Sequence, residues 1–120
     1  MFELEYCDQA GARPPEGAGA LRWSDGVPIT ARLLIGERLR REFERFDAGG
    51  EDLPAALVPL RRDARPVRLD EAIETALRAF SANRFFLIVD RRQIVDLDAP
   101  FPLTPGSSVV FVRLTPLKGG

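Results

Sequence analysis

The residues with the clearest potential for chemistry are the last two of the sequence, Gly119 and Gly120. A backbone carboxylate reacts only after activation, usually by adenylation, and an activating enzyme must admit it in extended form. Glycine suits this role because it lets a partner's backbone approach closely. Two such glycines would end about one chain in 200 by chance, and the plain alternative is a frayed end. The pair predicts that Gly120 is the substrate of another enzyme.

Other residue types that carry catalysis are scarce. The sequence has no histidine, which removes Ser-His-Asp and Cys-His arrangements and the commonest zinc ligand. The single cysteine, Cys7, supports neither an internal disulfide nor a cysteine-based metal cluster. Neither a P-loop nor a G-x-G-x-x-G motif occurs. We therefore expect a chain that is not an enzyme, with no catalytic residue, no metal site and no bound cofactor.

Length and charge narrow the class of protein further. A chain of 120 residues with 45% hydrophobic residues predicts one globular domain. The net charge of −1 lacks the basic excess of a nucleic-acid-binding protein. We expect no membrane span and no signal peptide, because apolar runs are short and the first residues are acidic. A lone cysteine fits a reducing compartment, so the expected location is cytoplasmic.

The first part of the sequence predicts two strands around a loop. Residues 2–7 alternate apolar and acidic side chains, which is typical of a half-buried strand. Residues 10–20 are rich in glycine and proline and predict a loop, after which residues 21–23 form a short return strand.

A helix is predicted next, with Thr30 as its N-cap and residues 31 to about 46 as its body. Charged residues spaced i,i+4, such as Arg38 and Glu42, favour a salt-bridged face in solvent. The apolar stripe spans an arc of about 80° at 100° per residue and consists of Ile35, Leu39, Phe43 and Phe46.

Residues 47–83 are predicted to be an insertion with a second helix at 70–83. The arginine-rich residues 61–65 favour an exposed turn, and a site for phosphate or an acidic partner is the alternative. We expect the stripe of the second helix to cover Leu33 or Leu34, or to stay partly exposed as an interface. This stripe comprises Leu69, Ile73, Ala76, Leu77 and Phe80.

The last third of the sequence predicts strands. Residues 85–89 and 109–112 are continuous apolar runs, and the second run has the pattern of a central strand. Residues 93–97 predict a return strand between them. The expected class is α+β with helices on one sheet face. The expected core pairs the helix residues Ile35, Leu39 and Phe43 with the strand residues Val110, Val112 and Phe86.

Two segments near the end of the sequence resemble a known family. Residues 102–111 read Pro-Leu-Thr-Pro-Gly-Ser-Ser-Val-Val-Phe, and residues 116–120 read Pro-Leu-Lys-Gly-Gly. They are similar to the Pro-Leu-x-Asp-Gly-Asp-Glu-Val-x-Phe and Pro-Pro-x-x-Gly-Gly motifs of the small subunit of molybdopterin synthase. Residues 30–34, Thr-Ala-Arg-Leu-Leu, resemble its helix opening, Thr-Val-x-x-Leu. The chain departs from that family at its acidic turn and at the first tail proline, where Pro105, Ser107, Ser108 and Thr115 stand.

The resemblance, shared with the bacterial sulfur carriers and ubiquitin, implies a β-grasp fold. It implies one ubiquitin-like domain over residues 1–120, with the insertion at 47–83 and a flexible tail at 115–120. An E1-like enzyme using ATP would adenylate Gly120, and an E2-like enzyme, a deconjugating peptidase and target proteins would be further partners. Gly119 would provide clearance in the enzyme's channel, and the residues that dock the tail would be Pro116, Leu117 and Lys118.

Three functions remain open at this point. The extra helix favours a protein modifier, because sulfur carriers usually have the minimal fold. The second is a sulfur carrier that forms a C-terminal thiocarboxylate. The third is a non-conjugated β-grasp module that binds partners or assembles into a homo-oligomer. Lys118 is the only lysine, so a modifier of this kind should decorate its targets singly and not build lysine-linked chains.

Overall fold

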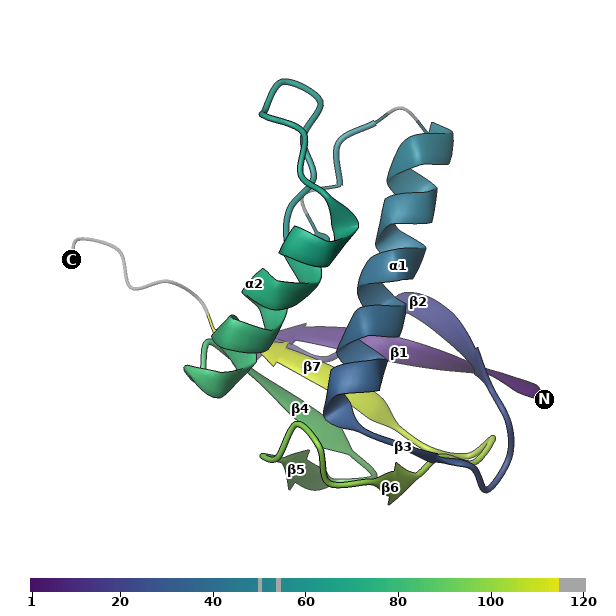
Figure 1. The fold of residues 1–120 in the computed structure, drawn as a ribbon. Helices are drawn as coiled ribbons and strands as arrows, with labels where there is room; N and C mark the ends of the chain where they lie inside the picture. Colours follow the sequence, from purple (N-terminus) through teal and green to yellow (C-terminus); the bar gives the residue numbers. More distant parts are fainter. Residues whose placement is uncertain (50, 54, 115–120) are drawn as a thin grey trace.

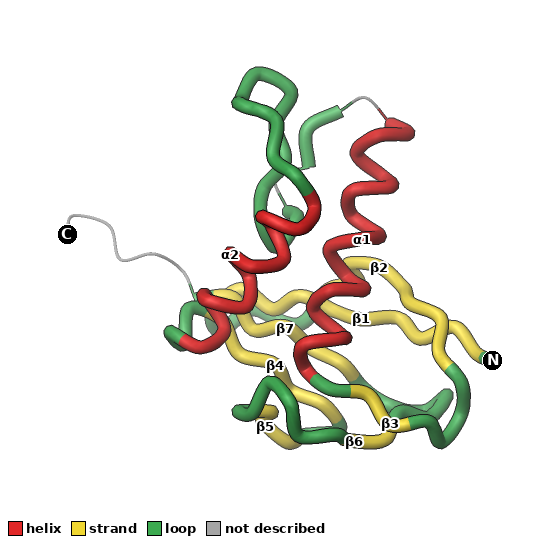
Figure 2. Tube along the Cα trace, in the orientation of Figure 1, coloured by secondary structure: helices red, strands yellow, loops and turns green. Residues whose placement is uncertain are grey.

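The computed structural model of the chain describes residues 1–49, 51–53 and 55–114. It confirms the α+β class, with a five-stranded mixed sheet, a two-stranded sheet and two helices. Both helices lie on the same face of the larger sheet (Figures 1 and 2). Within the described ranges, neither helix has the length and apolar character needed to cross a bilayer. The elements are β1 (Phe2–Ala10), β2 (Glu16–Trp23), β3 (Pro28–Ile29), α1 (Ala31–Gly49), α2 (Leu69–Ser81), β4 (Phe85–Val89), β5 (Arg92–Ile94), β6 (Phe101–Pro102) and β7 (Val109–Arg113).

The larger sheet has the strand order β2-β1-β7-β4-β5. Strands β1 and β7 pair in parallel, and the other pairs are antiparallel. The prediction that residues 109–112 form a central strand is confirmed, because β7 lies between β1 and β4. The short strands β3 and β6 pair separately beside the start of α1 (Figure 1).

Strand β2 corrects the prediction of a loop over residues 10–20. Residues 16–20 belong to this strand and pair with the second half of β1, with an irregularity in the register beside Tyr6 and Cys7. Their small side chains leave room for side chains of β1. A Cβ atom on Gly19 would lie 2.4 Å from the Tyr6 hydroxyl oxygen. The glycines that suggested a loop are therefore what lets the two strands approach.

Helix α1 begins where the sequence predicts and extends to Gly49. The Thr30 hydroxyl accepts a hydrogen bond from the Leu33 backbone N–H at 3.2 Å, which confirms the predicted N-cap. Leu34 is fully buried in the core, whereas Leu33 is 52% exposed. Phe43 is only partly buried at the edge of the core.

Helix α2 packs on α1 and on β4, which confirms that it lies against the body of the domain. Its buried residues are Ala72, Ala76 and Phe80, and Ile73 and Leu77 are partly buried. The Phe80 ring meets the Phe85 ring of β4 edge to face, with 5.9 Å between the centroids. These contacts join the second half of the insertion to the central core.

The core prediction for the sheet is wrong by one residue along both central strands. The buried side chains of β7 are Val109 and Phe111, and those of β4 are Phe85, Leu87 and Val89. Because side chains alternate across a strand, the partly buried Val110, Val112 and Phe86 belong to the face away from the helices. Continuous apolar runs fit either face, so the sequence pattern did not distinguish them.

The close approach of β2 to β1 predicts the effect of a small substitution. Gly19→Ala should lower the free energy of unfolding by about 1–3 kcal/mol, because the new methyl group would overlap a packed Tyr6 ring. Urea-induced unfolding monitored by fluorescence or circular dichroism measures this difference. Gly106→Ala is the matched control, since a Cβ there meets no atom within 4 Å. It should change stability by about 0.5 kcal/mol or less, and an equal loss in both variants would contradict the close contact.

Candidate functional site

The residues predicted to be activated or to dock the tail lie outside the described residues, namely Pro116, Leu117, Lys118, Gly119 and Gly120. What the structure does describe is the end of β7 that leads to them. Arg113, the last residue of β7, pairs with Ala10 of β1 and with Phe85 of β4. We call Arg113 the base of the tail, because residues 114–120 continue from it. It lies at one end of the sheet, between β1 and β4.

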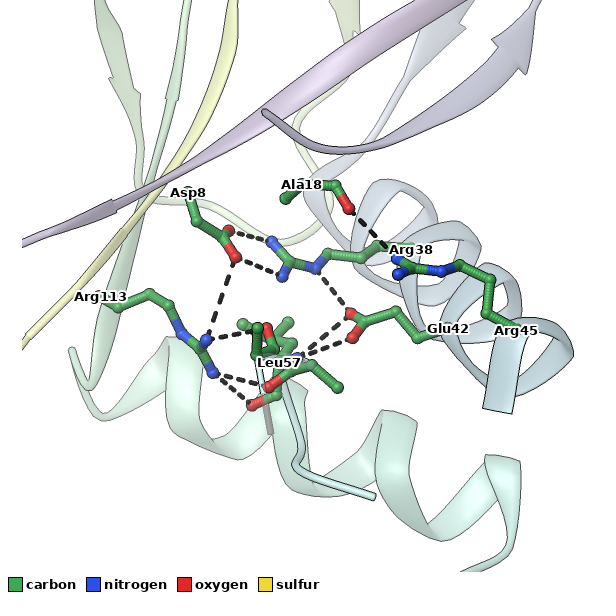
Figure 3. A network of polar contacts seen from close by, with 9 residues as sticks. Asp8, Ala18, Arg38, Glu42, Arg45, Leu57 and Arg113 are labelled. Carbon is green, nitrogen blue, oxygen red and sulfur yellow. Dashed lines mark hydrogen bonds and ion pairs between the residues drawn. The ribbon is translucent and has the colours of Figure 1, made fainter. Parts of the chain in front are cut away.

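Arg113 joins this sheet end to the segment that follows α1. Its Nη1 donates to the Ala55 carbonyl at 2.9 Å, and its Nη2 donates to the Ala56 and Leu57 carbonyls at 2.7 and 3.4 Å. One guanidinium thus holds three successive carbonyl groups (Figure 3). The first part of the predicted insertion is placed directly beside the base of the tail.

A buried ion network supports the same segment from α1. The Arg38 side chain is 1% exposed and donates through Nη1 and Nη2 to both carboxylate oxygens of Asp8, at 2.5 and 2.8 Å. Its Nε donates to Glu42 at 2.8 Å. The Glu42 carboxylate in turn accepts the Leu57 N–H, at 3.0 Å from Oε2. Asp8 also lies 4.0 Å from Arg113, so all four charged groups belong to one network (Figure 3).

The environment of Arg38 compensates the loss of its hydration. Burial alone would lower its pKa, but the hydrogen bonds that Arg38 donates to Asp8 and Glu42, together with their negative charges, outweigh burial and raise the pKa above its ordinary value. The guanidinium also lies 5.0 Å from the Tyr6 ring centroid and 4.5 Å from that of Phe111. Arg38 is therefore held as a permanent cation within the core.

A pocket with a volume of about 360 Å³ opens beside this network. Arg13 and Arg45 line it together with Glu16, and its apolar wall includes Leu53. Among the residues that the structure describes, no group of three histidine, cysteine or acidic side chains is placed to hold a metal ion. The arrangement can orient backbone and bind polar groups, and its Asp8 and Glu42 carboxylates are already held by Arg38.

The prediction that Arg38 and Glu42 form a solvated pair is wrong, because both side chains are buried. Two signals in the sequence point to this. Asp8 follows Leu4 and Tyr6 at the inward-facing spacing of β1. At 100° per residue, Glu42 lies about 20° and Arg38 about 60° outside the Ile35 edge of the apolar stripe, so Glu42 borders the stripe.

Cys7 is the free thiol of this region, on the strand that carries Asp8. Burial raises the pKa of the Cys7 thiol, and the charges of Glu5 and Asp8 raise it further. Less thiolate is then present at neutral pH, so alkylation should be slower in the folded protein than in the urea-unfolded protein, and should accelerate as pH rises. Iodoacetamide labelling followed by mass spectrometry measures both rates. A faster reaction in the folded protein would contradict this environment.

In comparisons with known proteins, the chain matches no protein-family model, no curated protein and no solved structure.

Proposed function

We propose that the chain is a ubiquitin-like β-grasp protein modifier whose Gly120 is activated and transferred to an amine of a target protein. The observation that carries this proposal is the position of β7. This strand is central, runs parallel to β1 and leads from the middle of the sheet to the residues that end in Gly119 and Gly120. The strand order, with α1 packed across one sheet face, is compatible with a β-grasp.

The proposed chemistry requires nothing catalytic of this chain. A carboxylate oxygen of Gly120 attacks the α-phosphorus of ATP in an E1-like enzyme, and pyrophosphate leaves. A cysteine thiol of the enzyme then displaces AMP to form a thioester, and the amine of a target displaces that thiol to form an amide. The need for ATP supports the cytoplasm as the compartment. In this scheme the sheet end acts as a rigid base from which the glycines reach a partner's active site.

The clamp at Arg113 favours a modifier over a sulfur carrier. Three carbonyls of residues 55–57 are fixed beside the base of the tail, and Glu42 fixes the Leu57 N–H. Any enzyme that takes the tail meets this ordered segment, which a minimal β-grasp would not need. Such a surface can select one activating enzyme or one set of targets.

The intact mass of the protein tests the proposal after incubation with ATP and the E1-like enzyme of its source cell, with cell extract as the source of targets. Conjugation adds the mass of a whole protein, and peptide analysis should place a Gly-Gly remnant on lysines of other proteins. Gly120→Val should abolish the conjugates, whereas the matched turn variant Gly106→Ala should retain them. A gain equal to the difference between sulfur and oxygen would identify a sulfur carrier. No ATP-dependent product would support a module whose tail is never activated.

Lys118 adds a prediction about the form of the conjugates in the same experiment. It is the only lysine, and arginine is not a normal acceptor of an isopeptide bond because its guanidinium stays protonated. Conjugates should therefore carry single copies, or extensions through the amine of Met1. Abundant branched peptides at Lys118 would contradict this prediction, as would loss of all conjugation in Lys118→Arg.

A further inference from the structure

A second hollow lies apart from the base of the tail, between the last turns of α1 and the segment that leads into α2. We call it the connector groove. It has a volume of about 550 Å³, which is within the range of ligand-binding pockets. Its apolar lining comes from both sides and comprises Phe43, Phe46, Pro59, Leu60, Pro66, Val67 and Leu69. The segment that forms the second side rises as the green loop above α2 in Figure 2.

The rim of the connector groove is rich in arginine. Four arginines line it, and Asp47 is the single carboxylate among the described lining residues. The arginines are Arg61, Arg62, Arg65 and Arg68. This set includes the arginine-rich segment that the sequence singled out as an exposed turn or a site for an acidic partner.

Three of these arginines have carboxylate partners that lie outside the lining. The distances are 3.3 Å from Arg61 to Asp63, 3.6 Å from Arg65 to Glu71, and 3.4 Å from Arg68 to Asp70. Their arginine side chains are 62%, 79% and 76% exposed. Exposed pairs of this kind contribute about 0–1 kcal/mol each, so a partner's carboxylates can replace them at little cost.

The fourth arginine, Arg62, is held in place by contacts within the chain. The Arg62 guanidinium lies 3.8 Å from the centroid of the Phe46 ring and donates to the Phe46 carbonyl. Its backbone N–H donates to the Asp52 carboxylate at 2.8 Å. Arg62 therefore covers one side of the apolar floor and joins the connector to the end of α1.

We infer that the connector groove binds an acidic peptide segment of a partner protein, with apolar side chains set between its carboxylates. The apolar floor provides contacts for the apolar side chains of the peptide. The three exposed arginines, Arg61, Arg65 and Arg68, provide partners for its carboxylates. Guanidinium groups bind carboxylates through paired, charge-assisted hydrogen bonds. The groove is separate from the Arg113 clamp, so this inference goes beyond the activation of Gly120 and does not depend on it.

Fluorescence polarisation with labelled peptides tests the inference on the full chain. The probe peptide alternates leucine or phenylalanine with aspartate or glutamate. One control peptide replaces every acid with lysine, and the other replaces every apolar residue with serine. We expect saturable binding of the probe alone, and an affinity that falls as salt rises because surface charges are screened. Equal binding of the serine control, or of a polyuridylate of similar charge, would overturn the inference in favour of simple attraction to anions.

Charge reversal on the rim locates the site. The double variant Arg61→Glu/Arg65→Glu should weaken probe binding by at least about tenfold, equivalent to about 1.4 kcal/mol. The single Arg65→Glu should weaken it by a smaller factor, and both variants should keep the unfolding transition of the native chain. Arg84→Glu is the matched control for the single Arg65→Glu, because it makes the same charge change at an exposed residue outside the groove. It should alter binding by about twofold or less. Equal losses in the rim and control variants, or no binding of any peptide, would overturn the proposal. Concentration-dependent self-association that the rim variants abolish would do the same, since it would assign the groove to a second copy.

Discussion

Replacement of Arg38 by alanine should lower the free energy of unfolding by about 3–5 kcal/mol. The substitution leaves the carboxylates of Asp8 and Glu42 in a largely buried site without their shared cation. Removing one member of a buried ion pair is costly because the remaining charge has lost its hydration and gains no partner. It also removes the guanidinium from above the Tyr6 and Phe111 rings. Urea-induced unfolding at neutral pH measures the difference.

Arg40→Ala provides the control on the same helix. Arg40 bonds Glu37 and Glu44, but its side chain is 46% exposed. Exposed pairs contribute little, so the loss should be about 1 kcal/mol or less. Arg38→Lys should fall between the two variants, because lysine keeps the charge and loses the planar, two-pronged contact with Asp8. A loss below about 1 kcal/mol for Arg38→Ala would contradict the buried network.

Phe111→Ala should also lower the free energy of unfolding by about 3–5 kcal/mol. The Phe111 ring is fully buried and packs against the Tyr6 and Phe85 rings, with centroid distances of 5.8 and 6.2 Å. Alanine would leave a cavity between the middle of the sheet and the helices, which neighbouring rings can fill only in part. Chemical denaturation of both proteins under the same conditions measures the loss.

A matched pair of valines in β7 tests which face of the strand is buried. Val109 is 1% exposed, and Val110 is its partly buried neighbour on the opposite face. Val109→Ala should cost about 1 kcal/mol more than Val110→Ala, since each buried methylene contributes about 0.8 kcal/mol. A larger loss for Val110→Ala than for Val109→Ala would indicate that Val110 faces the core, as the sequence pattern suggested, and would contradict the orientation of β7.

Local sequence patterns were sufficient to predict the two helices and most of the strands. The first helix was predictable because Thr30 is an N-cap and Ile35 and Leu39 recur at helical spacing. The second helix was predictable because its apolar residues share a narrow face and acids occupy its first turn. These signals depend only on residues within about one or two helical turns of each other, so they can be recognised without knowledge of the rest of the chain.

The buried network was not predictable with the same certainty, because the spacing of Arg38 and Glu42 is the same on a solvated and on a buried helix face. Both side chains are buried because α1 packs over β1. This packing brings Asp8, which lies 30 residues earlier in the chain, within hydrogen-bond distance of Arg38. The backbone of Leu57 completes the site from a segment whose prolines and short apolar runs predict no regular element.

The sequence by itself determined the α+β class, the two helices, the central position of the strand at 109–112 and the pair Gly119-Gly120. Periodicity, capping and composition encode these features locally. The tertiary structure decided which face of β4 and β7 is buried, that residues 16–20 form a strand, and that Arg113 places residues 55–57 beside the base of the tail. Each of these depends on pairing between segments far apart in the chain, and the register of such pairing is set by side-chain fit and not by any single segment.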